Sequence, residues 1–431
     1  MPRTPTTPAQ ISGHRFLVRR VEHALVRADA RMLHDPLRTR GRAVAAGAAL
    51  LVLVLAGTVI LGLIRPRDVA ADADLMLVRD TGALHVRIDD RVHPVANLAS
   101  ARLVLGQPAE AVRVGADALT GTAAGHPVGI PAAPDIASAD PAPAPPAVGV
   151  CEEAAPGLHE PVLVRSTVVR MGELPAGGAS ALVTDGEATW LVHDGRRARI
   201  DVGDPVLSRA LGLAAAPVRP VGAHLLAAIP ERGPVTAPHV PGQGDPSGFP
   251  APFDVVGTVV AVGQRRVVVR DDGAVDVAPV VADVLAAGGG VRTATEVELA
   301  GIPVAAGIEA DGLPGEIPDW APAEGWLCVD ADAETTTVTH GRAPHDVVPY
   351  PGADGEGPGV DGFSSPLRST TAVDTGGGVH LVSAGGARHL VENRGALAAL
   401  GYPSTVAVPW RVLVAFREGP ELTKTAALAA T

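Results

Sequence analysis

One stretch of 22 residues without a charged side chain, from Ala43 to Ile64, constrains this chain more than any other feature. A helix rises about 1.5 Å per residue, so the stretch can cross a hydrocarbon core of roughly 30 Å. A cleaved signal peptide would have a shorter apolar region nearer the N-terminus. A buried core helix would rarely lack charge over this length. We therefore expect a permanent membrane anchor.

The charges on the two sides of this stretch predict its orientation. Nine arginines precede it, against three acidic residues, Glu22, Asp29 and Asp35. Cytoplasmic flanks carry an excess of Lys and Arg. The N-terminus is therefore expected in the cytoplasm, with the C-terminal part on the periplasmic or extracytoplasmic side of the cell membrane.

The exported part is acidic. The whole chain has a formal charge of −12 and its first 42 residues carry +6, which leaves −18 for the remainder. Phosphate binding needs a basic surface, so nucleic acid is not an expected partner of this part.

Both cysteines of the chain, Cys151 and Cys328, lie in the exported part. Disulfides persist in oxidising compartments, so we predict that the two are bonded; two buried free thiols are the alternative. Two cysteines without a C-x-x-C motif do not make a zinc site by themselves. The chain-entropy model gives such a bridge roughly 4–5 kcal/mol of stabilisation as an upper value.

The segment before the anchor predicts an amphipathic helix that begins after Ser12 and ends at Asp35-Pro36. Apolar side chains recur on one face at helical spacing. The residues of this expected docking face are Leu17, Val21, Leu25 and Met32, with Ala28 between the last two. Such a helix cannot bury its apolar face alone. It must rest on anionic membrane lipid or pack on another cytoplasmic protein.

The exported part repeats the pattern of a β-hairpin followed by a short helix. In the clearest copy, strands at Trp190–Val192 and Ala198–Ile200 flank Asp194-Gly195, a dipeptide typical of tight hairpins. Asp204-Pro205 then begins a helix that Gly212 ends. Three further copies begin near Leu75, Arg265 and His380. Each unit is too small to bury a core, so the copies must pack on one another.

Motifs for enzymatic chemistry are absent from the sequence. A P-loop needs a Lys after a Gly-rich loop, and Lys424 is the only lysine and lacks that loop. Neither G-x-S-x-G nor H-E-x-x-H occurs. D-T-G occurs at Asp80 and at Asp374, as in the paired loops of an aspartic protease, but D-T-G is also a good turn sequence. We expect two ordinary turns, and we predict no catalytic, cofactor-binding or metal-binding residue.

Three stretches resemble one protein family. QISGHRFLVRRVEHALVRADARMLHDPLR, from Gln10 to Arg38 and followed by the membrane span, resembles EccB, the bitopic membrane-core component of actinobacterial type VII (ESX) secretion systems. The stretches VRIDDRVHPVANLASARLVLG and LVHDGRRARIDVGDPVLSRALGL resemble it too. The similarity covers nearly the whole chain.

The resemblance implies an α+β fold: a cytoplasmic helix, one transmembrane helix and an elongated periplasmic domain. That domain would hold four repeats around a central β-rich region tied by the disulfide. The implied partners are the FtsK/SpoIIIE-like motor ATPase EccC, the channel subunit EccD and EccE, together with further copies of the chain. We expect a structural subunit of a secretion machine. The alternative is a periplasmic hydrolase, because the family is sometimes labelled an ATPase.

The expected organisation follows from these patterns. The segments are the cytoplasmic helix (1–42), the transmembrane helix (43–64), repeat 1 (72–131), a Pro/Ala linker (132–150), a disulfide-closed region with repeats 2 and 3 (151–328), and the remainder of the central region with repeat 4 (329–431).

Overall fold

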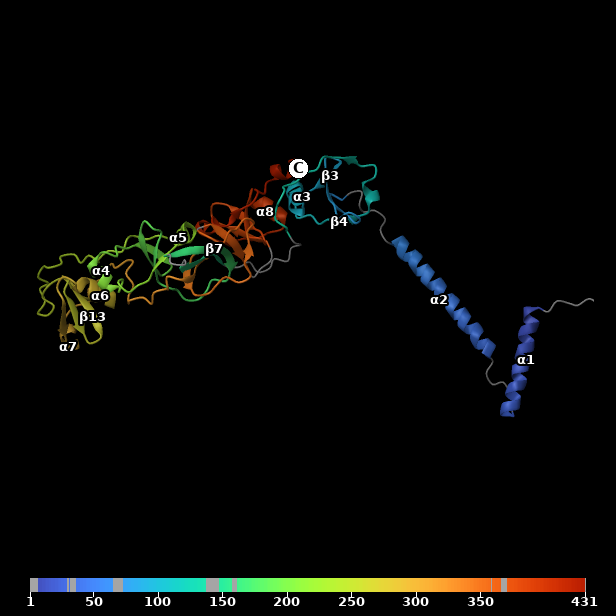
Figure 1. Ribbon diagram of the computed structural model, residues 1–431, viewed down its shortest axis with the longest axis horizontal. Coiled ribbons are helices and arrows are strands. Elements are labelled where there is room, and N and C mark those ends of the chain that lie inside the picture. Colours follow the sequence, from blue (N-terminus) through green and yellow to red (C-terminus); the bar gives the residue numbers. More distant parts are fainter. Residues whose placement is uncertain are drawn as a thin grey trace, which may run out of the picture. The chain divides into compact units, whose positions relative to one another are not determined.

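The computed structural model describes residues 7–28, 31, 36–64, 73–136, 147–156, 161–357, 359–365 and 370–430 (Figure 1). The chain divides into two units, Met1–Ala71 and Asp72–Thr431.

The first unit contains two helices, α1 (Pro8–Arg27) and α2 (Pro36–Ile64). Helix α1 begins earlier than the sequence predicts, because Thr7 and Gln10 form a capping box around its first turn. Two N-terminal N–H groups are satisfied in this way, which makes Thr7 a better start than Ser12.

Helix α1 also ends earlier than predicted. Ala28 adopts a left-handed conformation with φ of 57°, and its N–H donates to the carbonyl of Ala24. This is a common helix ending. The prediction that Asp35-Pro36 ends the first helix is therefore wrong. Pro36 instead occupies the first position of α2. A proline is tolerated there because an N–H at this position would have no partner within the helix.

Among the described residues of the second unit, the strands form five sheets. Four of these sheets share one plan, in which three antiparallel strands are followed by a helix and by a fourth strand that lies parallel to the first. We name these four the first, second, third and fourth sheets in chain order, and the remaining one the central sheet.

The first sheet, in the order β4-β1-β2-β3-β5, comprises β1 (Leu75–Val78), β2 (Leu84–Ile88), β3 (Arg91–Val95), α3 (Leu98–Leu105), β4 (Val112–Val114), the 3-10 turn η2 (Ala116–Leu119) and β5 (Ala123–Ala124). The second, in the order β10-β9-β8-β11, comprises β8 (Ala181–Thr184), β9 (Thr189–His193), β10 (Arg196–Arg199), α4 (Pro205–Ala210), β11 (Val218–Pro220) and α5 (Ala223–Ala228).

The third sheet, in the order β14-β13-β12-β15, comprises β12 (Val259–Val262), β13 (Arg265–Arg270), β14 (Gly273–Asp276), α6 (Pro279–Ala286), β15 (Val291–Ala294) and α7 (Glu296–Leu299). The fourth, in the order β23-β20-β21-β22-β24, comprises β20 (Thr371–Asp374), β21 (Val379–Val382), β22 (Ala387–Val391), α8 (Arg394–Leu400), β23 (Val406–Ala407), α9 (Trp410–Leu413), β24 (Arg417–Glu418) and α10 (Lys424–Leu428).

The central sheet, in the order β17-β16-β6-β7-β19-β18, comprises β6 (Ala147–Pro156), β7 (Val162–Gly172), β16 (Gly325–Ala331), β17 (Thr336–His340), β18 (Val348–Pro349) and β19 (Val360–Ser364). Its strand β6 begins inside the predicted Pro/Ala linker, which was expected to reach residue 150. Val148 and Val150 are fully buried in a core shared with other sheets, and their burial stabilises the strand conformation against the flanking prolines.

The hairpin of the second sheet shows how local sequence determines structure. Strands β9 and β10 pair up to His193 and Arg196, which leaves Asp194 and Gly195 as a two-residue loop. Both loop residues have positive φ, at 50° and 66°. This conformation matches the twist of the two strands, and Asp-Gly favours it.

Helix contacts join the sheets into a connected series. Helix α3 of the first sheet packs on α8 and α10 of the fourth. Helices α9 of the fourth and α5 of the second pack on each other and on β6 of the central sheet. Helix α4 of the second sheet packs on α6 of the third. The first and fourth sheets are therefore neighbours although they lie at opposite ends of the exported sequence.

Candidate functional site

Helix α2 contains the predicted membrane span. Its segment Gly41–Leu61 has a mean hydropathy of 2.7 and exposed apolar side chains. Exposed leucines and valines over 21 residues suit a lipid surrounding and not water. Among the described residues, this is the one helix long and apolar enough to span a membrane, as expected.

The predicted docking face lies on α1. Leu17, Val21 and Leu25 are 56 %, 58 % and 80 % exposed, and they follow one another at four-residue spacing along one side of the helix. Met32, the fourth predicted member, lies outside the described residues. The three described side chains form an apolar stripe with no cover from within the described part of the first unit.

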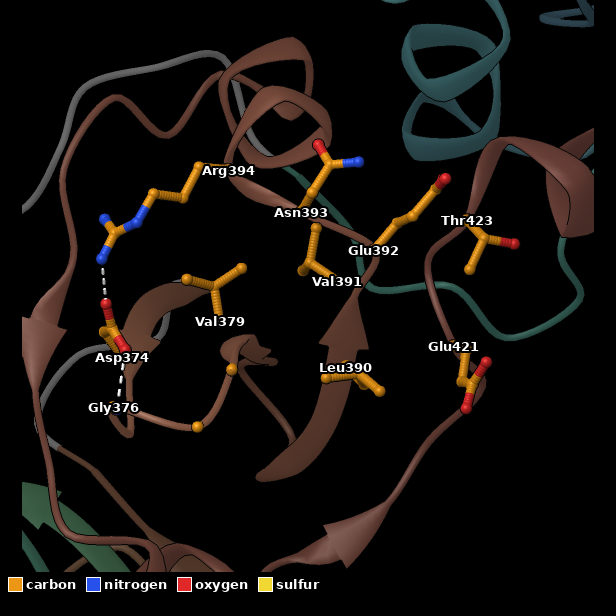
Figure 2. Close-up of a pocket in the computed structure, with 12 residues that line it drawn as sticks. Asp374, Gly376, Val379, Leu390, Val391, Glu392, Asn393, Arg394, Glu421 and Thr423 are labelled. Atoms are coloured by element: carbon orange, nitrogen blue, oxygen red, sulfur yellow. Dashed lines mark hydrogen bonds and ion pairs between the residues drawn. The ribbon is translucent and has the colours of Figure 1, made fainter.

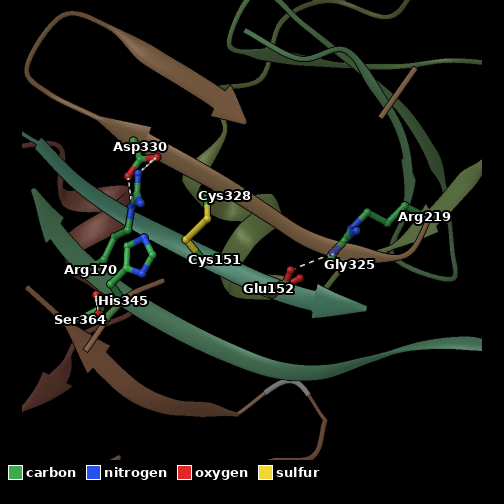
Figure 3. The surroundings of a disulfide bond; sticks show 9 residues. All are labelled: Cys151, Glu152, Arg170, Arg219, Gly325, Cys328, Asp330, His345 and Ser364. Carbon is green, nitrogen blue, oxygen red and sulfur yellow. Dashed lines mark hydrogen bonds and ion pairs between the residues drawn. A yellow bond between two sulfur atoms is a disulfide. The ribbon is translucent and has the colours of Figure 1, made fainter. Parts of the chain in front are cut away.

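Cys151 and Cys328 form a disulfide across the central sheet, although 177 positions separate them (Figure 3). They lie directly opposite each other on the antiparallel strands β6 and β16, with their Cα atoms 4.0 Å apart. Both side chains are buried. The bridge therefore links the strand that enters the central sheet to the strand that returns to it after the second and third sheets.

A charged pair lies beside the disulfide on the same face of the sheet, because alternate residues of a strand share a face (Figure 3). The Arg170 guanidinium donates two hydrogen bonds, of 2.5 and 2.6 Å, to the Asp330 carboxylate. Gly149 lies between the two residues in the register, and a Cβ there would come within 2.3 Å of an Asp330 oxygen. Burial raises the pKa of Asp330, and the bonds from Arg170 act against that rise.

Glu152 points to the opposite face of the central sheet and is fully buried. One carboxyl oxygen, Oε2, accepts a 2.8 Å hydrogen bond from the N–H of Gly222, the N-cap residue of α5. The other, Oε1, has no hydrogen-bond partner among the described residues. Burial raises the pKa of Glu152 to about 7, although the bond from Gly222 and the charge of Arg219 favour the ionised form.

Arg219 on β11, like Gly222 before α5, links the second sheet to the central sheet. Its Nη2 donates 2.8 Å hydrogen bonds to the carbonyls of Glu152 and Gly325 (Figure 3). The side chain is 1 % exposed, and burial lowers its pKa to about 10. The guanidinium thus binds the backbone of two neighbouring strands, and its role is to position them.

A groove of about 770 Å³ lies on the fourth sheet (Figure 2). Its lining includes the turn Gly376–Gly378, the side chain of Leu390, and the carboxylates of Asp374, Glu392 and Glu421. Two of these carboxylates have structural partners. Asp374 accepts hydrogen bonds from Arg394 and from the N–H of Gly376, and Glu392 accepts one from the N–H of Lys424.

The two D-T-G sequences form turns in different sheets. Gly82 and Gly376 have φ of 68° and 77°, as the third residue of such a turn requires. Asp80 follows β1 of the first sheet, whereas Asp374 ends β20 of the fourth sheet and pairs with Arg394. Because Asp374 is engaged in this pair, the arrangement differs from a protease dyad, in which two carboxylates share a proton. No group of three or more potential metal ligands gathers within the described residues.

Sequence reasoning missed the buried charges. Arg219 and Glu152 carry no local signal, because their partners lie 67 and 70 positions away. Only the fold brings these groups together. Glu152 and Arg219 link the second sheet to the central sheet, whereas Arg170 and Asp330 pair within the central sheet.

Comparisons with known proteins agree with this picture. The family model described as "Type VII secretion system ESX-1, transport TM domain B" matches residues 3–431. The ESX-1 secretion system ATPase EccB1 of Mycolicibacterium smegmatis is 32 % identical over 98 % of this chain and 95 % of its own length. The ESX-3 secretion system ATPase EccB3 of Mycobacterium tuberculosis is 31 % identical over 98 % of this chain and 89 % of its own length.

Solved structures are similar over comparable lengths. A chain of the intact ESX-5 inner membrane complex aligns with a TM-score of 0.65 and 27 % identity, covering 100 % of this chain and 96 % of that one. A chain of the EccB3 dimer from the ESX-3 core complex aligns with a TM-score of 0.67 and 27 % identity, covering 83 % of this chain and 100 % of that one.

Proposed function

The chain belongs to the EccB family of type VII secretion proteins, and on that premise we propose that it is a structural, membrane-anchored subunit of an ESX secretion complex. The observation that carries the proposal is the match along the full chain to a component of an intact inner membrane complex. The membrane span and the exported sheets both fall within that match, so the similarity is not limited to one segment.

The proposed orientation has the N-terminus in the cytoplasm and residues 73–430 on the periplasmic side. Nine arginines before the span support it through the positive-inside rule. The buried disulfide between Cys151 and Cys328 also supports it, since such bonds persist in oxidising compartments. A reporter fused after Thr431 should be active only outside the cytoplasm, and activity inside would overturn the orientation.

We assign the exported domain four copies of one repeat unit around the central sheet. The common strand order of the first, second, third and fourth sheets supports this division. Related structures are described as an EccB3 dimer and as the periplasmic assembly of an ESX-5 complex. By analogy, the exported sheets of this chain would associate with other copies above the membrane.

The apolar stripe Leu17–Val21–Leu25 would dock α1 on a neighbouring cytoplasmic subunit, such as an EccC-like motor ATPase or an EccD-like or EccE-like membrane subunit. Val21→Asp should weaken assembly of the complex on native gels. Arg19→Ala, two positions away along α1, is the matched control. Normal assembly in Val21→Asp, or equal loss in both variants, would contradict docking through the apolar stripe.

A hydrolase remains the competing function, because the EccB1 and EccB3 relatives are named ATPases. The sequence contains no G-x-x-x-x-G-K-[ST] motif to place a lysine on the terminal phosphates. The described polar clusters instead bind backbone groups across sheet junctions. A structural role accounts for these clusters directly.

The proposal is tested in a host strain from which the chain has been deleted. The assembled ESX membrane complex should disappear from native gels, and the wild-type chain should restore it. Normal assembly of the complex without the chain would show that the chain is not one of its structural subunits.

A further inference from the structure

We propose that the segment Lys424–Ala430 is a strap that closes the first sheet onto the fourth. The first sheet is the one that follows the membrane span in the sequence, so the strap would set how that sheet is attached to the rest of the exported domain. The contacts at the two ends of the segment carry this inference.

The base of the strap is fixed to the fourth sheet. Leu422, just before it, pairs with Val391 in a parallel bridge. The N–H of Lys424 donates a 3.0 Å hydrogen bond to Glu392 Oε2, and Thr423 Oγ1 accepts one of 3.0 Å from the N–H of Ala426. Helix α10 is thus capped at a defined place beside strand β22.

The far end of the strap reaches the first sheet. Helix α10 packs on α3, and Ala430 pairs with Val128 in an antiparallel bridge. The N–H of Gly129 donates a 3.3 Å hydrogen bond to the carbonyl of Ala429. Ala427 is fully buried, while Leu428 beside it is 38 % exposed. One side of α10 therefore seals the contact and the other faces solvent.

The first and fourth sheets share one buried apolar cluster. A single buried cluster contains Ala99 and Leu103 of α3, Val128, Leu397 of α8 and Ala427 of the strap. Val128 and Ala427 are 1 % and 0 % exposed, so detaching the strap from the first sheet would expose part of this shared cluster. The second, third and central sheets take no part in the cluster and should keep their structure.

Hydrogen exchange on the full-length protein in detergent tests the strap. Ala427→Asp places a charge in the sealed contact, whereas Leu428→Asp, the matched control, places it on the solvent side of the same helix. We expect exchange of α3 and of residues 128–130 to be faster by on the order of tenfold or more in Ala427→Asp alone. Strands β8 and β12 should exchange as in the wild type. Unchanged protection of α3 in Ala427→Asp, or equal loss in both variants, would overturn the proposal.

A second variant tests the geometry without placing a charge in the contact. Val128→Cys combined with Ala430→Cys places two thiols at the paired positions of an isolated antiparallel bridge, which is a spacing that a disulfide can bridge. We expect an intramolecular cross-link between these two positions in the full-length protein, with the Cys151–Cys328 bond retained. Two free thiols under oxidising conditions would contradict the strap, as would a link only between separate molecules. The cross-linking experiment still tests the strap even if the Ala427→Asp substitution unfolds the whole domain.

Discussion

The guanidinium of Arg102 donates a 2.8 Å hydrogen bond to the backbone carbonyl of Leu400, 298 positions away in the sequence. Leu400 ends helix α8, and Gly401 after it has φ of 101°, which closes the helix and leaves room for the arginine. A cation at this end also interacts favourably with the helix dipole. The guanidinium of Arg102, on α3 of the first sheet, therefore caps the C-terminus of α8 in the fourth sheet.

Arg102→Ala should destabilise the exported domain by about 1–3 kcal/mol, because the carbonyls of Leu400 and Ala109 lose a buried donor. Denaturant unfolding of the solubilised protein measures the change. Arg209 is the matched control, since it is also the fifth residue of its helix, α4, but is exposed. Equal losses of stability in Arg102→Ala and Arg209→Ala would show that the hydrogen bond to Leu400 makes no specific contribution to stability.

Cys328→Ser should lower the thermal stability of the exported domain while membrane insertion stays intact. The bond closes a long loop, so its loss costs at most roughly 4–5 kcal/mol. Cys151→Ser should have the same effect, and the double variant should be no worse than either single one. A melting temperature that is the same with and without reductant in the wild type would contradict this prediction.

The raised pKa of Glu152 predicts that stability falls as the pH rises from about 4.5 to about 7. Burial raises its pKa from 4.5 to about 7, so the folded state favours the neutral carboxyl. The contribution is fully present below the unfolded pKa of 4.5 and is lost as the pH rises through about 7. The difference amounts to about 3 kcal/mol at most.

Glu152→Gln should remove that part of the pH dependence between pH 5 and 8, because the amide stays neutral. Glu153→Gln, at the adjacent and partly exposed position, should leave the dependence unchanged. Unfolding free energies measured across this pH range decide the matter. A Glu152→Gln variant that keeps the full pH dependence of the wild type would contradict this prediction.

Purified full-length chain should not hydrolyse ATP above a contaminant control. Phosphoryl transfer needs a cradle of N–H groups and a cation against the developing charge. The exported part is strongly acidic, and its single lysine, Lys424, lies at the start of α10 with its backbone bonded to Glu392. Turnover that co-elutes with the chain and disappears on substitution of an exported acidic residue would reveal a site missed here.

Local signals made much of the fold predictable. The charge-free stretch predicted the span, and the Asp194-Gly195 dipeptide predicted a two-residue hairpin loop that the structure contains. Helix ends were less predictable. Thr7 and Gln10 form their capping box before the predicted start, and the left-handed Ala28 ends α1 without a glycine.

Features that depend on distant residues could not be read from the sequence. Strand β6 forms within a Pro/Ala-rich stretch because Val148 and Val150 enter a core made largely by later residues. The segment Lys424–Leu428 has no strong local helix signal, yet it forms α10 with Ala427 fully buried against the first sheet. In the same way, Arg102 finds its acceptor only after the fourth sheet has folded beside the first.

Affinity purification of the tagged chain from native membranes in mild detergent, followed by quantitative mass spectrometry, tests the central claim most directly. If the chain is a structural subunit of an ESX complex, an FtsK/SpoIIIE-like motor ATPase and polytopic membrane subunits should co-purify in constant proportion to it. Recovery of the chain alone, with those subunits present in the same membranes but absent from the eluate, would contradict the account.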